Sequence, residues 1–462
     1  MSDFDAAVVG AGPNGLAAAV ELARSGRRVL VVEAEEAIGG GTRTEELTLP
    51  GFRHDVCSAI HPSGVASPFF SDIGLEVEWV QPPLPFAHPL DGGRVAVMHR
   101  SVDETAAQFG TDASTYRSLM GPLVDSIDAL VEEVLAPLTL IPDHPAAFTR
   151  IAAIGGLPAS LVASRFETEE ARGLLAGLSA HSIAPFNAMA TAGVGLMLGV
   201  IGHAMGWPMA RGGSQRIAEA LADQLRLHGG TIETGRRIDS VADLPGGLHL
   251  LDVMPPAAYR IGSGRVSASA ARKLRGWKPG AGVFKVDWAL DGPIPWADPL
   301  SSQAATVHLG GTWEEVKAAE DAVFAGAHPE RPFVLLAQQS LFDDTRAPPG
   351  KHTAWAYCHV PNGSTTDMTA PIESQIERFA PGFRDLVLGR STRSPLQFQS
   401  YNPNYIGGDI GGGGFGLRKV LQIGTKRPYE LGSGIFLCSS ATPPGAGVHG
   451  MCGYFAARAA LD

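Results

Sequence analysis

The segment from residue 4 to residue 33 constrains the fold of this chain more than any other. A short apolar run, residues 6–9, leads into Gly-Ala-Gly-Pro-Asn-Gly at residues 10–15, and a run of helical composition follows. A second apolar run, residues 28–32, stops at Glu33. The acidic residue stands about twenty positions beyond the turn, so this order of strand, glycine turn, helix and strand predicts a dinucleotide-binding βαβ unit.

Each glycine of the turn has its own physical role. Gly10 allows the tight turn, Gly12 removes a Cβ that would hold a pyrophosphate away from the backbone, and Gly15 lets the helix lie close to the sheet. The phosphates then sit at the positive end of the helix. Glu33 can accept hydrogen bonds from both hydroxyls of an adenosine ribose and would repel a 2′-phosphate. The segment therefore predicts FAD or NAD rather than NADP.

The composition indicates a well-buried protein with an acidic balance of charge. The 462 residues suffice for two or three structural units, and 45% are hydrophobic while only 18% are charged. The net charge of −11 argues against a nucleic-acid partner, because phosphate binding depends on basic surface.

Cysteine usage and the first residues both predict a cytoplasmic protein. Four cysteines lie far apart, without a CxxC pair or the spacing of metal ligands: Cys57, Cys358, Cys438 and Cys452. This distribution fits a reducing compartment and predicts neither a metal site nor a redox dithiol. The N-terminal residues lack the basic and apolar runs of a secretion signal.

Two motifs after Glu33 are expected beside the nucleotide. Three glycines at residues 39–41, followed by Thr42 and Arg43, expose backbone amides, and Arg43 offers a fixed cation to a phosphate or carboxylate. Residues 50–62 then bring an Asp and two His together with small residues. This pattern is compatible with backbone packed against a flat ligand and equally with an ordinary surface turn.

Helical composition prevails from residue 68 to residue 209. Apolar residues between 116 and 134 recur at helical spacing and predict one amphipathic helix. The stretch 173–210 contains no charged residue, and a run of that length could span a bilayer. Its proline, histidines and glycines favour buried helices that line an apolar cavity, with shallow, peripheral membrane contact as the alternative.

The rest of the chain alternates between the first sheet and a second one. Ser214 is expected to cap a helix that ends at residues 229–230. Three short strands are expected to rejoin the first sheet: 231–234, 237–241 and 248–253. Strand-like alternation between residues 282 and 360, with helices at 313–324 and 371–379, predicts a second, mostly antiparallel sheet.

A second GxGxxG motif, formed by Gly445, Gly447 and Gly450, precedes a helical run at residues 454–461. The strand and acidic residue of an independent nucleotide site do not follow it. We therefore expect this strand, turn and helix to join the first domain and to bring a helix N-terminus to the same cofactor. The positive end of that helix would stabilise the negative charge of a reduced flavin, which favours FAD over NAD.

With these motifs, nearly the whole chain resembles the phytoene desaturase-like branch of the flavin amine oxidase superfamily, which includes proteins named for a pyridine nucleotide-disulphide oxidoreductase domain. The resemblance rests on residues 10–15 with Glu33, on 39–43, on 211–214 with 229–230, and on 442–453. The predicted fold is α/β, with a Rossmann-like FAD-binding domain, a helical insertion that forms the substrate cavity and an α+β substrate domain. The expected boundaries are 1–67, 210–281 and 420–462 for the FAD-binding domain, 68–209 for the insertion and 282–419 for the substrate domain.

The resemblance implies non-covalent FAD, since residues 400–416 contain no counterpart of the cysteine that tethers flavin in monoamine oxidases. It implies adenosine near Glu33 and Ile238, diphosphate near residues 12–15 and Arg43, and the isoalloxazine ring between residues 59–61 and 447–449. The cofactor-binding residues expected on this basis are Gly10, Gly12, Pro13, Asn14, Gly15, Glu33, Ala34, Gly40, Gly41, Thr42, Arg43, Ala59, Ile60, His61, Ile238, Ala441, Gly447, Val448, His449 and Met451.

The expected reaction moves a hydride between flavin and a carbon of an apolar small molecule, making or saturating a C=C bond. A proton must move with the hydride. The candidate acids or bases are His54, Asp55, His61 and His449. Two alternatives stay open: a flavin amine oxidase that acts on a C–N bond, and a non-redox flavoprotein that serves as an isomerase or as a binding or assembly partner. The sequence does not specify the substrate, the direction of hydride transfer or the electron acceptor. It also leaves the oligomeric state open, and a homo-oligomer is one of the possible states.

Overall fold

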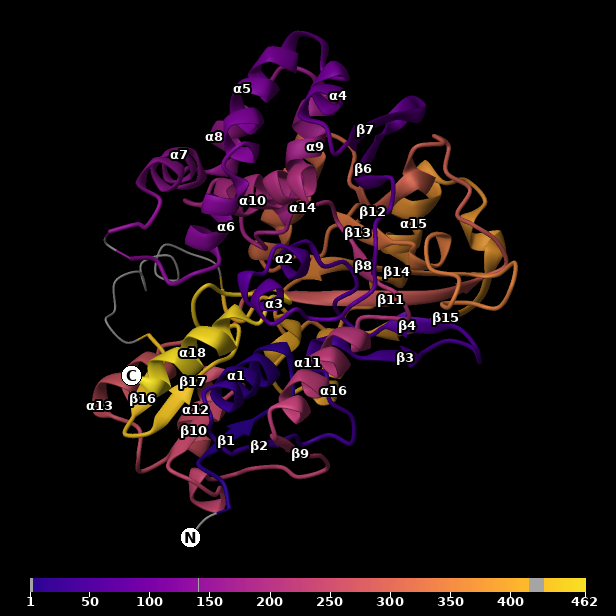
Figure 1. The fold of residues 1–462 in the computed structure, drawn as a ribbon. Coiled ribbons are helices and arrows are strands. Elements are labelled where there is room, and N and C mark those ends of the chain that lie inside the picture. The colour runs from indigo at the N-terminus through magenta and orange to yellow at the C-terminus, as the bar shows by residue number, and fades with distance from the viewer. Residues whose placement is uncertain (1–2, 140, 415–427) are drawn as a thin grey trace.

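The computed structural model describes residues 3–139, 141–414 and 428–462, which form two large β-sheets, two small two-stranded sheets and a layer of helices (Figure 1). The sheet that contains the N-terminal strand lies at the bottom of Figure 1, the second sheet lies above it to the right, and most helices from α4 to α10 lie at the top. The α/β fold class predicted from the sequence is confirmed.

The first sheet has six strands in the order β16-β17-β10-β1-β2-β9. All neighbours in it are parallel except β16 and β17. Its strands are β1 (Ala6–Val9), β2 (Val29–Val32), β9 (Thr231–Glu233), β10 (Leu248–Leu251), β16 (Glu430–Gly432) and β17 (Ile435–Leu437). The predicted return of residues 231–234 and 248–253 to this sheet is confirmed.

The strand expected at residues 237–241 does not form. After β9 the backbone amides of Gly235 and Arg236 donate to carbonyl oxygens of Glu35 and Glu33. These amides bind the loop that follows β2, so the chain has already left the sheet. A short 3-10 helix, Val241–Asp243, begins where the expected strand would have ended.

Three helices cover the first sheet on one side and lie side by side in Figure 1: α1 (Pro13–Arg24), α11 (Gln215–Leu227) and α18 (Met451–Leu461). A Cβ built on Gly453 of α18 would lie 1.8 Å from the carbonyl oxygen of Asn14 in α1. The two glycine turns of the sequence thus belong to one packed unit, because β17 pairs with β10 while α18 packs on α1.

We expect Gly453→Ala to lower the free energy of unfolding by about 1–3 kcal/mol, since the added methyl group has no room between α1 and α18. Urea denaturation would measure this. Gly121→Ala, in the helix Ala113–Val124, is the matched control, because both glycines lie inside helices but a Cβ at residue 121 meets nothing within 4 Å. Equal stability of the wild type and Gly453→Ala would contradict the close packing.

The second sheet has seven strands in the order β15-β11-β14-β13-β12-β6-β7. All neighbours are antiparallel except β6 and β12, so the predicted, mostly antiparallel sheet is confirmed. Its strands are β6 (Leu84–Leu90), β7 (Arg94–Met98), β11 (Gly282–Leu290), β12 (Ala304–Leu309), β13 (Val334–Ala337), β14 (His352–Val360) and β15 (Val387–Arg393). Helices α14 (Trp313–Phe324) and α15 (Thr369–Phe379) lie where they were expected.

The segment expected to be helical, residues 68–209, also supplies strands β6 and β7. Pro85 and Pro89 disguise β6 in the sequence, because proline lacks the amide that a strand interior uses. The single amphipathic helix expected between residues 116 and 134 is two helices, α5 (Ala113–Val124) and α6 (Ile127–Val134). The carbonyl of Pro122 accepts hydrogen bonds from the Ser126 hydroxyl and from Arg150, instead of the amide that would continue α5.

The uncharged stretch 173–210 forms most of α9 (Glu169–Ala180) and all of α10 (Thr191–Ala204), which pack against each other and against α7 (Pro145–Gly155). No helix among the described residues combines the length and apolar character needed to cross a membrane.

The remaining elements are short: α2 (Pro62–Val65), α3 (Pro68–Asp72), α4 (Val102–Ala107), α8 (Ala159–Ala163), α12 (Pro255–Ile261), α13 (Ala268–Arg275), α16 (Pro395–Tyr401), β3 (Thr44–Glu46), β4 (Arg53–Asp55), β5 (Trp79–Val80) and β8 (Met209–Ala210).

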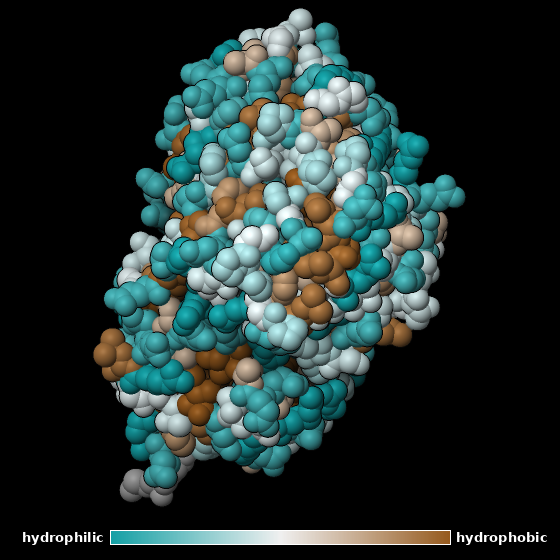
Figure 2. Space-filling view, turned by 90° about the vertical axis from the view of Figure 1, so that its right-hand side faces the viewer, coloured by the Kyte–Doolittle hydropathy of each residue, from teal (hydrophilic) through white to brown (hydrophobic). Residues whose placement is uncertain are grey.

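Figure 2 shows one face of the molecule, on which hydrophilic residues predominate and hydrophobic residues gather in a few separate patches. The larger apolar side chains lie mostly inside, in clusters that cover both sheets.

Candidate functional site

A cavity of about 930 Å³ extends from the glycine turn between β1 and α1 to helices α6, α7 and α10. All the cofactor-binding residues expected from the sequence line it except Gly15, His61 and Met451. Gly12 and Gly447 therefore face the same space, although 435 positions separate them in the sequence. The carboxyl ends of parallel strands converge at one edge of the sheet, which explains why distant motifs meet here.

The glycine-lined end of the cavity, where the sequence predicts the nucleotide (the nucleotide end), is made of backbone in close approach. Gly10 has a φ of +100°, and a Cβ on Gly12 would lie 2.8 Å from a carboxylate oxygen of Asp252. A Cβ on Gly40 would lie 3.2 Å from the Cα of Gly12. Helix α1 begins at this turn without a side-chain cap, and the buried Oδ1 of Asn14 has no hydrogen-bond partner among the described residues. Because the amide of Gly15 already donates to Asp252, the start of α1 leaves its other first-turn amides and the side-chain amide of Asn14 for a ligand.

Glu33 and Arg43 are held in place beside this turn. One carboxylate oxygen of Glu33 accepts from the amide of Ala11 at 2.7 Å, and the other accepts from the amide of Glu35 at 3.0 Å. Arg43 donates twice to the carbonyl of Ala37, and its Nη2 lies 3.5 Å from Glu33. The Glu33 carboxylate is thus oriented before any ribose binds.

Asp252 is a cavity residue that was not expected from the sequence. It follows β10, lines the cavity, and its Oδ2 accepts from the amide of Gly15 at 2.9 Å. Burial raises the pKa of Asp252 to about 7 against the effect of this hydrogen bond, and the charge of Glu33 adds to the rise. The signal that could have found it is its place near the carboxyl end of the strand 248–253, which was expected to rejoin the first sheet.

The other end of the cavity is apolar. Its lining comes from α6, α7, α10 and the chain after α9, and none of these lining side chains is charged. They include Val134, Phe148, Ile151, His181, Val194, Met197, Leu198 and Ile201. Thr306, Leu335, Trp355 and Tyr357 line the cavity from the second sheet. The uncharged stretch 173–210 therefore supplies part of a cavity wall, as the sequence predicted.

His54 and His61 are buried and do not line the cavity. His54 Nε2 lies 2.8 Å from the Thr48 hydroxyl, and its Nδ1 lies 3.5 Å from Asp287. Burial lowers the pKa of His54 to about 3. His61 Nε2 lies 2.8 Å from the Ser214 hydroxyl, and burial lowers the pKa of His61 to about 4. The Ser214 hydroxyl is therefore not the side-chain cap of α11 that the sequence suggested.

His449 is the member of the expected acid–base group that lines the cavity. Its Nδ1 accepts a hydrogen bond from the amide of Met451 at 3.0 Å, so any proton on the neutral ring is on Nε2. Burial lowers the pKa of His449 to about 4.

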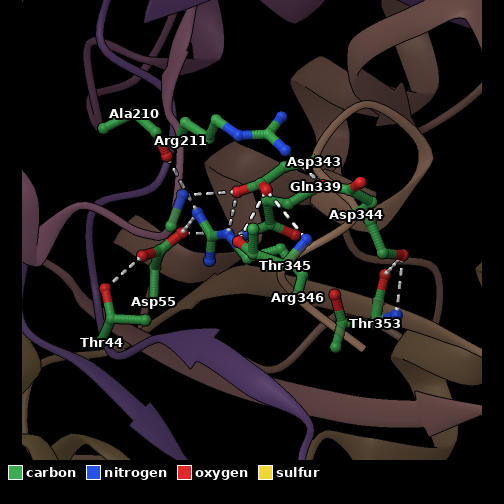
Figure 3. A network of polar contacts seen from close by, with 12 residues as sticks. Thr44, Asp55, Ala210, Arg211, Gln339, Asp343, Asp344, Thr345, Arg346 and Thr353 are labelled. Carbon is green, nitrogen blue, oxygen red and sulfur yellow. Dashed lines mark hydrogen bonds and ion pairs between the residues drawn. The ribbon is translucent and has the colours of Figure 1, made fainter. Parts of the chain in front are cut away.

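Asp55, the fourth candidate, belongs to a buried ion cluster away from the cavity (Figure 3). Arg346 Nη2 lies 3.0 Å from Asp55, and Arg346 Nε lies 2.7 Å from Asp343. Asp55 also accepts from the amide of Ser214, and Asp343 accepts from the amide of Gly212. Burial acts to raise the pKa of Asp55, but Arg346 and these hydrogen bonds hold it below its ordinary value. The cluster ties β4 and the start of α11 to the chain that follows β13.

A second buried ion pair lies on the cavity-facing side of the second sheet. Lys285 Nζ lies 2.6 Å from Asp287 Oδ1 and 5.5 Å from the centre of the Trp355 ring, and Trp355 lines the cavity. This pair was not expected from the sequence, although a Lys and an Asp two positions apart in an expected strand share one face. Among the described residues, no group of three or more His, Cys, Asp or Glu side chains is arranged to hold a metal ion.

Comparison with known proteins agrees with this architecture. Residues 8–73 match a family model described as an NAD(P)-binding Rossmann-like domain. The chain is 26% identical to pyridine nucleotide-disulfide oxidoreductase domain-containing protein 2 of Rattus norvegicus, over 99% of this chain and 93% of that protein. A shorter match, to one of the chains of a limonene dehydrogenase from Castellaniella defragrans, is 31% identical over 126 residues and covers 26% of this chain and 23% of that one.

Solved structures extend the likeness to the whole fold. An oxidoreductase from Methanosarcina mazei superposes with a TM-score of 0.68 at 15% identity, covering 99% of both chains. Cyclohexylamine oxidase from Brevibacterium oxydans superposes with a TM-score of 0.61 at 17% identity, covering 99% of this chain and 98% of that one. The chain is an oxidoreductase of the flavin amine oxidase fold. The resemblance predicted from the sequence motifs is confirmed, and residues of the matched Rossmann-like domain line the glycine-rich end of the cavity.

Proposed function

We propose that this oxidoreductase binds FAD non-covalently and transfers a hydride between the flavin and a carbon of an apolar substrate, forming or saturating a carbon–carbon double bond. The observation that supports this most is the continuity of the cavity. Glycine turns and Glu33 lie at one end, and uncharged helical walls lie at the other. Bound flavin would supply the hydride acceptor or donor, while the chain binds, orients and shields the reactants.

The residues at the nucleotide end fit FAD. Glu33 would hold the adenosine ribose, and the positive end of α1 would hold the diphosphate. A second, distant glycine turn around Gly447 lines the same cavity, which supports a cofactor longer than one mononucleotide. Ala59 and Ile60 also line the cavity, and these uncharged side chains would suit a flat aromatic ring.

The apolar end supports a hydrophobic substrate. Binding of an apolar ligand there is favourable, because apolar surface of both the ligand and the protein is removed from water. A charged ligand would lose its hydration in this part of the cavity without gaining an ionic partner. The local likeness to a protein named as part of a limonene dehydrogenase supports carbon–carbon rather than carbon–nitrogen chemistry.

Oxidation of an amine is the rival function, because cyclohexylamine oxidase shares the fold. An ammonium substrate needs a carboxylate or an aromatic cage. Among the described lining residues, carboxylates stand at the nucleotide end or are already engaged. Asp409, for example, accepts hydrogen bonds from the amides of Gly280, Gly411 and Gly413. The aromatic rings of Trp355 and Tyr357 do line the cavity, but the Lys285 ammonium already lies 5.5 Å from the Trp355 ring and would disfavour a second cation there. We therefore place the amine second.

Glu33→Gln is expected to weaken FAD binding roughly tenfold, because a charge-assisted hydrogen bond to the ribose is lost while the acceptor for Ala11 remains. Titration of the apo-protein with FAD, followed by quenching of flavin fluorescence, would measure the Kd. Glu46→Gln, an exposed carboxylate of β3, is the matched control. A wild type that binds no flavin would refute the proposed cofactor.

The reaction itself is tested by anaerobic absorbance of the flavin. The oxidised holoprotein would be mixed with lipophilic alkanes and alkenes, the photoreduced holoprotein with alkenes, and a parallel series with amines. Bleaching or recovery of the flavin band with the apolar compounds supports the proposal. Bleaching with amines alone would select the amine oxidase, and a bound flavin that never changes its redox state would select a non-redox role.

A further inference from the structure

His181 is a polar group in the apolar part of the cavity wall, and its position is fixed from two sides. It follows helix α9 and lines the cavity. Its ring stands at 88° to the indole of Trp207, with centroids 5.5 Å apart, and its Nε2 lies 3.2 Å from Nε2 of His308 on β12. Nδ1 of His181 has no hydrogen-bond partner among the described residues and is not one of the fully enclosed atoms. Nδ1 is therefore the atom that a cavity ligand can reach.

The hydrogen bond to His308 decides which nitrogen of His181 carries the proton. His308 is 0% exposed, and its Nδ1 is enclosed without a partner among the described residues. A bond between two imidazole nitrogens holds one proton. If His181 donated it, His308 would bury an N–H on Nδ1 without an acceptor. If His308 donates the proton from Nε2, its enclosed Nδ1 carries only an unused lone pair, and burying that acceptor costs less free energy than burying an N–H without a partner. The favoured arrangement leaves the proton of His181 on Nδ1, toward the cavity.

Two glycines of helix α9 make room for the buried rings of His308 and His88. A Cβ on Gly177 would lie 2.5 Å from Nδ1 of His308, and a Cβ on Gly173 would lie 2.9 Å from Cδ2 of His88. Glycine in a helix interior costs stability, and here two of them stand one turn apart on the face that covers the imidazoles. Because these two glycines have no side chains, α9 can pack close to the imidazoles, and His181 at its end can contact His308.

Both rings are neutral at pH 7. The pKa of His181 is lowered to about 3, chiefly by burial and then by the neighbouring His359, whose own Nδ1 lies 2.9 Å from Glu320. The pKa of His308 lies well below its ordinary value because of burial, followed by His181 and His88. No carboxylate or ammonium among the described side chains hydrogen-bonds to either ring. A neutral N–H donor suits a neutral oxygen acceptor, and it offers no ionic partner to a carboxylate or an ammonium.

We propose that the substrate of the apolar cavity carries a neutral oxygen function, such as a ketone or aldehyde, whose oxygen accepts a hydrogen bond from Nδ1–H of His181. This inference rests on the proposed function and narrows its substrate from apolar compounds in general to apolar carbonyl compounds. His308 acts as a positioning residue, since it orients His181 and assigns its proton. Met197, Leu198 and Ile201 of α10 supply apolar surface for the hydrocarbon part.

The test uses two probes of the same shape, 2-decanone and 2-methyl-1-decene, in which a methylene group replaces the carbonyl oxygen. Their Kd values would be measured with the oxidised holoprotein by tryptophan fluorescence, since Trp207 and Trp355 line the cavity. The ratio of the alkene Kd to the ketone Kd should fall roughly five- to tenfold in His181→Phe. Comparing ratios between variants cancels the difference in water solubility of the probes.

Two further variants separate a hydrogen bond from a loss of packing. His181→Asn should keep most of the wild-type ratio, because an amide N–H can stand near the position of Nδ1. His228→Phe, an exposed residue after α11, should leave the ratio unchanged. Infrared difference spectra give an independent reading in the wild type alone: the C=O stretch of bound 2-decanone should move to lower frequency than in alkane solvent.

An unchanged ratio in His181→Phe, an Asn variant that behaves like the Phe variant, an unshifted C=O stretch or the failure of 2-decanone to bind would each overturn this inference. None of these measurements requires electron transfer. Selective binding of the ketone by a protein whose flavin never reacts with any apolar compound would refute the proposed function and leave the role of His181 standing. Flavin chemistry on hydrocarbons with no preference for the ketone would do the reverse.

Discussion

Arg346→Met should lower the free energy of unfolding by about 3–5 kcal/mol, because it leaves two buried carboxylates without their cation. Asp55, Asp343 and Arg346 are each 0% exposed (Figure 3). Asp55 lies on β4, Asp343 and Arg346 follow β13, and their hydrogen bonds reach the start of α11. Equilibrium unfolding in urea, followed by circular dichroism, would measure the change.

Arg211→Met is the matched control for this cluster. Arg211 lies next to it in Figure 3, but its partner Asp344 is 82% exposed. Exposed ion pairs contribute at most about 1 kcal/mol, so this variant should remain close to the wild type. Adding Asp55→Asn and Asp343→Asn to Arg346→Met should recover part of the lost stability, because amides replace the uncompensated charges. Equal losses in Arg211→Met and Arg346→Met would contradict the role given to the buried cluster.

Asp252→Asn should make the apo-protein more stable than the wild type at pH 8, by about 4 kcal/mol. Burial raises the pKa of Asp252 from 3.8 to about 7 in the folded state. The folded wild type therefore holds a proton that the unfolded chain releases, and its stability falls as pH rises from about 4 through 7. The Asn variant does not ionise, and its side-chain oxygen can still accept from the amide of Gly15.

Urea denaturation of both proteins between pH 4 and pH 8 would check this sign. The two curves should nearly coincide at pH 4 and diverge as pH rises, whereas Asp72→Asn, an exposed residue of α3, should follow the wild type throughout. A difference that stays constant with pH would mean that the Asp252 carboxyl is not the group responsible. If FAD binds as proposed, its diphosphate adds negative charge beside Asp252, so FAD affinity should also decline above pH 7 in the wild type.

Most of the first sheet and its glycine turns could be predicted because their signals are local. The βαβ unit from β1 to β2 is contiguous, and its glycines are required by backbone conformation and close approach. The failures have equally definite causes. Residues 237–241 have strand-like composition, but the preceding amides bind the loop after β2. Ser214 looks like a helix cap, but its hydroxyl contacts His61, which lies 153 positions away in sequence.

The candidate site divides in the same way. The expected cofactor residues line one cavity almost completely, because their motifs lie in turns at the carboxyl edge of the sheet. The expected acid–base residues rest on residue type and on nearness to the predicted cofactor motifs, and neither carries information on burial. Asp55 proved to be paired with Arg346, and His54 to lie near Asp287.

By itself the sequence determined that this chain forms an α/β protein with a Rossmann-like domain and an apolar region, since glycine turns and the absence of charge act through local backbone geometry and solvation. Only the tertiary structure decided which polar groups face the cavity. The partners that orient them stand far apart in the chain, as His181 and His308 do, or Asp252 and Gly15. Burial and pairing depend on which strands become neighbours, and that is settled by packing of the whole chain.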